Sequence, residues 1–272
     1  MNIVDRLSVS RGLCAYGVCD CDLLLAHMTD AARLGLTRRI AQPRSVFVAL
    51  FPYAAEQRPG NLSLYARGRD YHAVIQQTLG DMAAELRTAY PENNFIVLAD
   101  NSPLPEVLAA AYAGLGCIGA HGLLIHPLYG SYVFIGTIVT DCTLPTTPHT
   151  PTTCINCGAC RRACPVGLDK SRCLSALTQQ GGTLTDEQAA LVREHPLIWG
   201  CDTCQLVCPM NRTAQQTPLA DFREHPICSL SLDDLEGLTR KQFLAKYPER
   251  AFTWRGPAPI RRNLLLKQGE QP

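Results

Sequence analysis

The chain has 272 residues, of which 46% are hydrophobic, and a formal net charge of +1. This length and composition can bury a substantial core as one large or two modest domains, and the balanced charge excludes any inference of nucleic-acid binding from overall charge. The longest apolar runs, at 46–51 and 95–99, are far shorter than the roughly 20 residues that a membrane span needs. We therefore expect a soluble protein with no membrane partner.

The first 40 residues predict one strand and one helix. Residues 13–18 are predicted to form a short strand. Residues 22–35 are predicted to form a helix that is capped by Asp20 or Asp22 and ends at Gly35. Asp is a favourable N-cap because its carboxylate accepts a hydrogen bond from a free amide of the first turn.

Two buried strands and a long helix follow. Residues 45–53 are almost continuously apolar, as expected of a strand that is buried on both faces. Apolar residues recur at helical spacing over 71–86 and predict an amphipathic helix that stops before Pro91. Residues 95–99 predict a second buried strand, which Asp100 directly follows. Ligands of alternating α/β sheets gather at the carboxyl ends of strands, so Asp100 is expected to face a crevice; the alternative is an Asp that caps the next turn.

The region before residue 154 ends in a glycine-rich segment and a linker. After a predicted helix at 106–113, four glycines fall between Gly114 and Gly122. They predict backbone that passes close to a bulky ligand or to another strand. Residues 131–140 predict a long strand, and the Pro-Thr-rich stretch at 143–153 predicts a domain boundary.

Eight of the fourteen cysteines lie between residues 154 and 208. The first run, at 154–165, is Cys-x2-Cys-x2-Cys-x3-Cys-Pro, which bacterial ferredoxins use to hold iron–sulfur clusters. The second run, at 201–209, is the same run without its first cysteine, and one isolated cysteine lies between the runs. In two-cluster ferredoxins the fourth cysteine of each run ligates the other cluster. This spacing predicts two 4Fe-4S clusters, one held by Cys154, Cys157, Cys160 and Cys208, and the other by Cys164, Cys173, Cys201 and Cys204.

Zinc and disulfides are the alternative uses of these cysteines. Two Cys-x2-Cys pairs suffice for zinc, which leaves the third cysteine and the Cys-Pro pair unexplained. Structural disulfides need an oxidising compartment, and residues 1–6 do not resemble an export signal. The remaining cysteines fit a reducing cytoplasm. We therefore expect an α/β (α+β) domain at 1–145, a ferredoxin-like double 4Fe-4S domain at 146–212 and a short helical, basic segment at 213–272.

The segment at 240–267 is locally basic. It carries eight basic residues and one acidic residue, a balance of 8 − 1 = +7. Such a segment is either a solvated surface or a surface that contacts anions or RNA. The basic residues are Arg240, Lys241, Lys246, Arg250, Arg255, Arg261, Arg262 and Lys267.

From about residue 65 to 263 the motifs resemble the epoxyqueuosine reductases, cobalamin-dependent iron–sulfur enzymes of queuosine tRNA modification that are related to reductive dehalogenases. The stretches at 65–72, 113–119 and 129–131 are similar to the motifs of this family, and Asp100 matches its strand-end proton donor. The most specific match is Gly200-Cys201-Asp202-x-Cys204-Gln205-x-Val207-Cys208-Pro209-x-Asn211.

The resemblance implies a cytoplasmic reductase in which electrons pass through both clusters to a cobalamin that reduces the substrate. It implies Asp100 as the proton donor, an external low-potential electron donor of the ferredoxin or flavodoxin type, and tRNA as a partner of the 240–267 segment. The residues that it places around the substrate and cofactor are Tyr65, Asp70, Tyr71, His72, Gly114, Gly116, Gly119, Tyr129 and Ser131.

Several departures indicate a short and divergent member. Cys117 and Ala120 stand where the family has Trp and Lys, the region before Tyr65 is short, and the chain ends soon after Asn263 without the helical repeats that many members append. These departures fall on cofactor and substrate contacts, while the cluster cysteines are complete. The alternatives are therefore a two-cluster electron-transfer protein without its own cobalamin chemistry, and an RNA-binding module with structural clusters.

Overall fold

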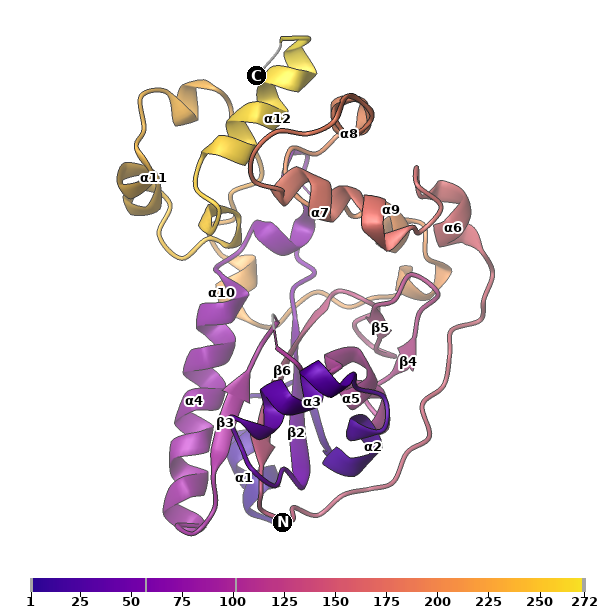
Figure 1. The fold of residues 1–272 in the computed structure, drawn as a ribbon, viewed down its shortest axis with the longest axis vertical. Helices are drawn as coiled ribbons and strands as arrows, with labels where there is room; N and C mark the ends of the chain where they lie inside the picture. The colour runs from indigo at the N-terminus through magenta and orange to yellow at the C-terminus, as the bar shows by residue number, and fades with distance from the viewer. Residues whose placement is uncertain (1, 57, 101, 271–272) are drawn as a thin grey trace. The chain divides into compact units, whose positions relative to one another are not determined.

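A computed structural model describes residues 2–56, 58–100 and 102–270 (Figure 1). The chain divides into two compact units. The sheet unit comprises the chain up to Pro52, His72–Asn156 and Thr213–Gln215. The cysteine unit comprises Tyr53–Tyr71, Cys157–Arg212 and the chain from Gln216 on.

The sheet unit is built on a four-stranded sheet with the order β1-β2-β6-β3. Its strands are β1 (Ala15–Asp20), β2 (Ser45–Pro52), β6 (Val133–Thr140) and β3 (Phe95–Leu98), and a separate two-stranded sheet pairs β4 (Cys117–Ile118) with β5 (Leu124–Ile125). Each neighbouring pair is antiparallel, with Ala15 opposite Leu50, Pro52 opposite Val133, and Leu98 opposite Thr137. The carboxyl ends of β2 and β3 therefore meet the amino ends of β1 and β6 at one edge of the sheet.

This topology corrects the expectation that strand carboxyl ends gather together, because that rule belongs to parallel sheets. Asp100 still follows the end of β3, but its neighbours at this edge come from both kinds of strand end. The segments that lead into β1 and β6, at residue 14 and at 129–132, thereby lie at the same edge as Asp100.

Helices cover both faces of this sheet, and this explains the continuous apolar run in β2, where every residue is buried. One face packs on α4 (Tyr71–Ala89), since a Cβ atom at Gly136 of β6 would lie 2.6 Å from Ile75 and 2.9 Å from Leu79. In Figure 1, α4 runs along the β3 side of the sheet. The other face packs on α2 (Cys21–Leu25), α3 (Asp30–Thr37) and α5 (Glu106–Tyr112). An additional helix, α1 (Ile3–Ser10), begins the chain.

The predicted helix at 22–35 is wrong as one element. The structure has two helices, and Thr29 caps the second by accepting a hydrogen bond from the amide of Ala32. Asp20 is the N-cap of the first helix, as predicted, and accepts from the amide of Asp22 at 2.9 Å. The first strand, predicted at 13–18, lies two residues later, at Ala15–Asp20.

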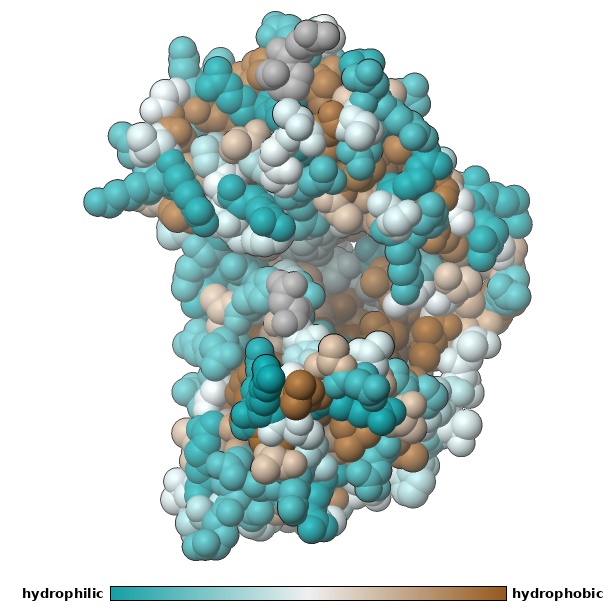
Figure 2. All heavy atoms as spheres, in the orientation of Figure 1, coloured by the Kyte–Doolittle hydropathy of each residue, from teal (hydrophilic) through white to brown (hydrophobic). Residues whose placement is uncertain are grey.

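The cysteine unit consists of short helices around two hydrophobic cores. Its helices are α6 (Ala159–Ala163), α7 (Leu174–Gln179), α8 (Asp186–Glu194), α9 (Thr203–Leu206), α10 (Ala220–Arg223), α11 (Arg240–Lys246) and α12 (Ala258–Gln268), with single 3-10 turns at Leu64–Ala66, Lys170–Arg172, Pro209–Asn211, Asp233–Leu235 and Ala251–Thr253. One core surrounds Trp199 and Phe243, and the other joins α7, α8 and α12. Figure 2 shows polar side chains over most of the visible surface of each unit.

The two units differ from the three predicted domains. Residues 146–156 belong to the sheet unit, and residues 216–270 belong to the cysteine unit instead of forming a separate segment. Residues 53–71, which end at the first residue of α4, belong to the cysteine unit, where the amide of Ser63 donates to the carbonyl of Trp199 at 2.9 Å. The overall architecture is a mixed α/β fold, as predicted. Within the described ranges, no helix combines the length and apolar character required to cross a membrane.

Candidate functional site

The structure groups the four cysteines predicted to bind the second cluster. Cys164 follows α6, Cys173 is the N-cap residue of α7, Cys201 precedes α9 and Cys204 lies within it. Burial, followed by the negative charges of Cys201, Cys173 and Cys164, raises the pKa of the Cys204 thiol to about 12. These four sulfur atoms are therefore near neighbours, although 40 residues separate the first from the last along the chain.

Three cysteines predicted for the first cluster also lie together. The pKa of Cys208 is raised by burial and by the charges of Cys157 and Cys160. The fourth, Cys154, belongs to the sheet unit, where its sulfur accepts a hydrogen bond from the amide of Ala120 at 3.3 Å. Hydrogen bonds to cluster sulfurs are one of the means by which proteins set reduction potential.

Within the part of the chain that the structure describes, no disulfide joins any of the fourteen cysteines. Four sulfurs on one zinc ion, each at about 2.3 Å from the metal, would lie about 3.8 Å apart. Across the described chain, no group of three or more His, Cys, Asp or Glu side chains has the arrangement of a single-ion site. Thiolates around a cuboidal cluster bind separate iron atoms and are spaced more widely.

Polar side chains of the second run anchor it within the cysteine unit. Asp202 is buried, and its carboxylate accepts hydrogen bonds from the hydroxyl of Ser63 and, at 2.8 Å, from the amide of Leu64. The side-chain amide of Gln205 donates to the hydroxyl of Tyr53 at 3.0 Å, and that of Asn211 donates to the carbonyl of Gln205 at 2.8 Å. The Asp, Gln and Asn of this motif therefore fix the loop that carries Cys201, Cys204 and Cys208.

A second cluster of polar groups lies at the end of β3, in the sheet unit. The imidazole Nε2 of His72 lies 3.7 Å from the carboxylate of Asp100, and both side chains are about half-exposed. Asp100 has a left-handed backbone, with φ of 52°. Its amide donates to the carboxylate of Glu106 at 3.3 Å, and the hydroxyl of Ser102 donates to the same carboxylate at 2.9 Å. The structure thus brings His72 and Asp100 together, and adds Glu106, which was not predicted as a site residue.

The other predicted residues of the 65–72 stretch belong to the cysteine unit. Tyr65 lies in a 3-10 turn against the Trp199 core, and Tyr71 is the first residue of α4. The amide of Asp70 donates to the carbonyl of Glu249 at 2.6 Å. Arg69 pairs with Asp221 at 2.9 Å and with Glu249 at 2.7 Å, so part of this motif has a structural role.

The predicted glycines contact the chain itself. A Cβ atom at Gly114 or Gly119 would lie 2.5 Å from the ring of His149 or His121, and one at Gly116 would collide with the carbonyl of Ile125 in β5. The sequence left a ligand or another strand as the bulky neighbour, and at Gly116 it is a strand. Because other residues of the chain fill the space beside these glycines, the glycines alone do not indicate an open cofactor-binding pocket.

Two features near the glycine-rich segment at 114–122 are nevertheless suited to binding a polar ligand. His121 Nδ1 accepts a hydrogen bond from the amide of Leu123 at 3.2 Å, so Nε2 carries the proton. That Nε2 atom is buried and has no hydrogen-bond partner within the described residues. Tyr129 hydrogen-bonds Cys14 at the Asp100 edge of the sheet, and Ser131 beside it is buried.

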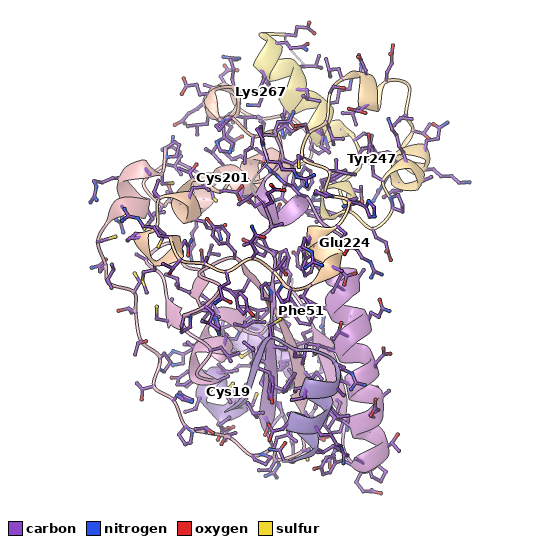
Figure 3. The ribbon with its side chains drawn as sticks, turned by 180° about the vertical axis from the view of Figure 1, so that it is seen from behind. Cys19, Phe51, Cys201, Glu224, Tyr247 and Lys267 are labelled. Atoms are coloured by element: carbon purple, nitrogen blue, oxygen red, sulfur yellow. The ribbon has the colours of Figure 1, made fainter. Side chains whose placement is uncertain are left out.

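The basic segment is not uniformly a cationic surface. Arg262 is buried and donates to the carbonyls of Leu177, Gln180 and Gly182. Arg250 and Lys267 also donate to backbone carbonyls. The exposed members are Arg240, Lys241, Lys246, Arg255 and Arg261. In Figure 3, Lys267 and Cys201 mark the α12 and α9 regions of the cysteine unit, while Cys19 and Phe51 mark β1 and β2 of the sheet unit.

Comparisons with known proteins match both units. Residues 33–101 match a family described as "Epoxyqueuosine reductase QueG, DUF1730", and residues 153–211 match a "4Fe-4S double cluster binding domain". The chain is 32% identical over 226 residues to an epoxyqueuosine reductase of Lactococcus garvieae, covering 80% of this chain and 64% of that protein. It is 35% identical over 233 residues to one of Burkholderia pseudomallei, covering 79% and 56%. The chain therefore spans about three fifths of the length of these relatives.

Solved structures agree with these matches. The structure of epoxyqueuosine reductase from Streptococcus thermophilus superposes with a TM-score of 0.80 and 25% identity, over 97% of this chain and 79% of that chain. A crystal structure of an epoxyqueuosine reductase with a modified tRNA-Tyr stem loop has the same fold, with a TM-score of 0.81 and 24% identity, over 97% and 79%. The cysteine runs, the fold and these matches show that the chain belongs to the epoxyqueuosine reductase family.

Proposed function

We propose that this chain is an iron–sulfur reductase of the epoxyqueuosine reductase type, with two 4Fe-4S clusters. The observation that carries the proposal is the grouping of Cys164, Cys173, Cys201 and Cys204 in one unit. Cys173 lies outside both runs, and a chain that used its cysteines only for packing would have no reason to bring it to the other three. The ligand set of the first cluster is Cys154, Cys157, Cys160 and Cys208.

In this proposal Asp100 supplies the proton of the reduction. Cobalamin, when bound, provides the reducing centre, and an external low-potential donor supplies electrons through the clusters. Asp100 lies at a sheet edge with its carboxylate 3.7 Å from Nε2 of His72, so a proton would pass between the two groups through one bridging water. His121 Nε2, Tyr129 and Ser131 would contact the cofactor.

The main alternative is a two-cluster electron-transfer protein without its own cobalamin chemistry. It is favoured by Cys117 and Ala120, which stand where the family has Trp and Lys, and by the contacts of Gly114, Gly116 and Gly119 with the chain itself. Titration of the anaerobically reconstituted chain with cobalamin separates the two. A shift of the cobalamin absorption spectrum to the base-off form supports the reductase, and an unchanged spectrum supports the carrier.

The clusters are tested by metal content. Anaerobic reconstitution should give about eight irons and eight acid-labile sulfides per chain, because eight cysteines have the two-cluster arrangement. About four irons, or stoichiometric zinc, would contradict the ligand assignment. Cys228→Ser, which changes a cysteine outside the predicted ligand sets, is the control and should leave the iron content unchanged.

The proton donor is tested by Asp100→Asn. Asn keeps the size of the side chain but cannot release a proton, so turnover of an epoxyqueuosine-containing tRNA should fall by roughly 10²- to 10⁴-fold while both clusters survive. Asp81→Asn, an exposed position on α4, is the matched control. Full activity in the Asp100 variant would mean that Asp100 only caps the turn, since Asn caps about as well as Asp.

We also propose that the exposed basic residues of 240–267 contact tRNA. Lys241→Ala and Arg255→Ala should each weaken binding of a tRNA stem loop several-fold and reduce the slope of log affinity against log salt by about 1. Arg39→Ala, an exposed cation of the sheet unit, is the control. Equal effects of all three substitutions would indicate non-specific attraction only.

A further inference from the structure

Glu106 binds two residues of the loop that follows β3. It is the first residue of α5, and its two carboxylate oxygens have different donors. Oε2 accepts from the amide of Asp100 at 3.3 Å, and Oε1 accepts from the hydroxyl of Ser102 at 2.9 Å. The Ser102 hydroxyl also accepts a hydrogen bond from the amide of Leu104 at 3.3 Å. One half-buried carboxylate therefore ties the loop to α5.

Asp100 needs such a contact because of its backbone. Its φ of 52° lies in the left-handed region, which non-glycine residues adopt at a cost unless the surrounding structure holds them there. We propose that Glu106 is the positioning residue of this site, and that it holds Asp100 in the conformation in which its carboxylate faces His72. Only the expected effect on turnover rests on the proposed function. The hydrogen bond by which Glu106 holds Asp100 in place does not depend on it.

The charges around Glu106 make this hold depend on pH. The pKa of Glu106 is raised to about 7: burial and the charge of Asp100 raise it, while the hydrogen bonds from Ser102 and from the Asp100 amide and the charge of His72 lower it. When Glu106 is ionised, both oxygens accept strongly. When it is protonated, one oxygen carries a hydrogen and accepts weakly, so the hold on the loop weakens as pH falls through about 7.

Amide hydrogen exchange of the reconstituted 272-residue chain tests the contact between Glu106 and Asp100 without any substrate. At about pH 8, Glu106→Ala should speed exchange at the Asp100 amide by about tenfold or more, because its acceptor is gone. Ser102→Ala, which leaves that acceptor in place but frees one carboxylate oxygen, should give a smaller increase. Glu85→Ala, which removes an exposed carboxylate on α4, is the control and should change nothing at Asp100. Unchanged protection of Asp100 in Glu106→Ala would overturn the inference.

A milder variant covers the case in which Glu106→Ala does not fold. Gln keeps one acceptor oxygen, so Glu106→Gln should retain part of the protection of the Asp100 amide. Gln cannot ionise, so the loss of protection that the wild type shows between about pH 8 and pH 6, after correction for intrinsic exchange rates, should be absent in this variant. A pH dependence in this variant equal to that of the wild type would contradict the role assigned to the Glu106 carboxylate.

Turnover separates the inference from the proposed function. With epoxyqueuosine-containing tRNA, Glu106→Gln should lower kcat about tenfold with little change in KM, and should remove the part of the pH profile that titrates near 7. A wild-type kcat and pH profile in this variant would overturn the inference. Absence of turnover by the wild-type chain, together with the predicted exchange results, would contradict the proposed function alone and leave the hold on Asp100 supported.

Discussion

Arg262 on α12 is expected to be among the most costly charged residues to remove from the cysteine unit. Its guanidinium is buried and donates to three carbonyls, those of Gln180 at 2.7 Å, Gly182 at 2.8 Å and Leu177 at 3.2 Å. Burial lowers its pKa, which shows that the surroundings disfavour the charge and that these hydrogen bonds must compensate for lost hydration. Arg262→Ala removes the guanidinium donor from three carbonyls at or just beyond the end of α7, although the carbonyl of Leu177 still accepts from the amide of Gln180.

The expected cost is about 3–5 kcal/mol in the free energy of unfolding. A charged hydrogen bond contributes about 1.5–3 kcal/mol, but water entering the space left by the side chain replaces part of three such bonds. The melting temperature should fall by roughly 6–20 °C, measured by circular dichroism under anaerobic conditions. Because α7 begins directly after Cys173, a chelator should also remove iron faster from this variant.

Arg261→Ala is the matched control. It removes the same charge from the neighbouring position of the same helix, but Arg261 is exposed. Its effect should be within about 0.5 kcal/mol, as is usual for surface positions. Equal destabilisation by the two substitutions would refute the assignment of a structural role to the Arg262 hydrogen bonds.

Three further predictions concern the two sites. Cys173→Ser should lower iron content from about eight to about four per chain and leave the spectrum of the other cluster intact; unchanged iron would mean that another group is the eighth ligand. Asp202→Asn should cost about 1–3 kcal/mol of stability, because an amide oxygen cannot replace a carboxylate that accepts from both Ser63 and Leu64, and an unchanged denaturation midpoint would contradict this. The pKa of Glu106 rises from 4.5 to about 7 on folding, so its contribution to stability is full below about pH 4.5 and is lost as pH rises through 7. At about 1.4 kcal/mol per pH unit, the loss over these roughly 2.5 units is at most about 3.5 kcal/mol. Denaturant titrations at several pH values should show this pH dependence of stability reduced in Glu106→Gln.

Features that depend on a few neighbouring residues could be predicted from the sequence. The continuous apolar run of β2, the helical spacing of α4 and the Asp20 cap each follow from local backbone geometry, and the structure confirms them. The helix predicted at 22–35 was wrong because Thr29 offered a second local cap, which competes with continuation of the helix.

The cysteine spacing determined the double-cluster prediction because cluster geometry constrains residues three apart in the chain. Cys173 needed more than spacing. The structure brings it to Cys201 and Cys204 through α7 and α9, and only the packing of these helices decides which distant thiol arrives there.

The contact between Asp100 and Glu106 could not be predicted from the sequence pattern. The sequence singles out Asp100 by its place after a strand, whereas Glu106 enters only as a residue that accompanies Asp100 in the family resemblance, with no role of its own. Only the left-handed turn between β3 and α5 brings that carboxylate to the Asp100 amide.

The sequence by itself predicted the double-cluster cysteine pattern, the buried strand β2 and the family resemblance, because these depend on residue types at fixed short separations. The tertiary structure decided the antiparallel strand order, which basic residues of 240–267 are exposed, and which polar side chains of the second cysteine run anchor it. These depend on contacts between residues far apart in the chain. A basic side chain has the same local pattern whether it faces water, as Arg261 does, or three carbonyls, as Arg262 does, and only packing distinguishes the two.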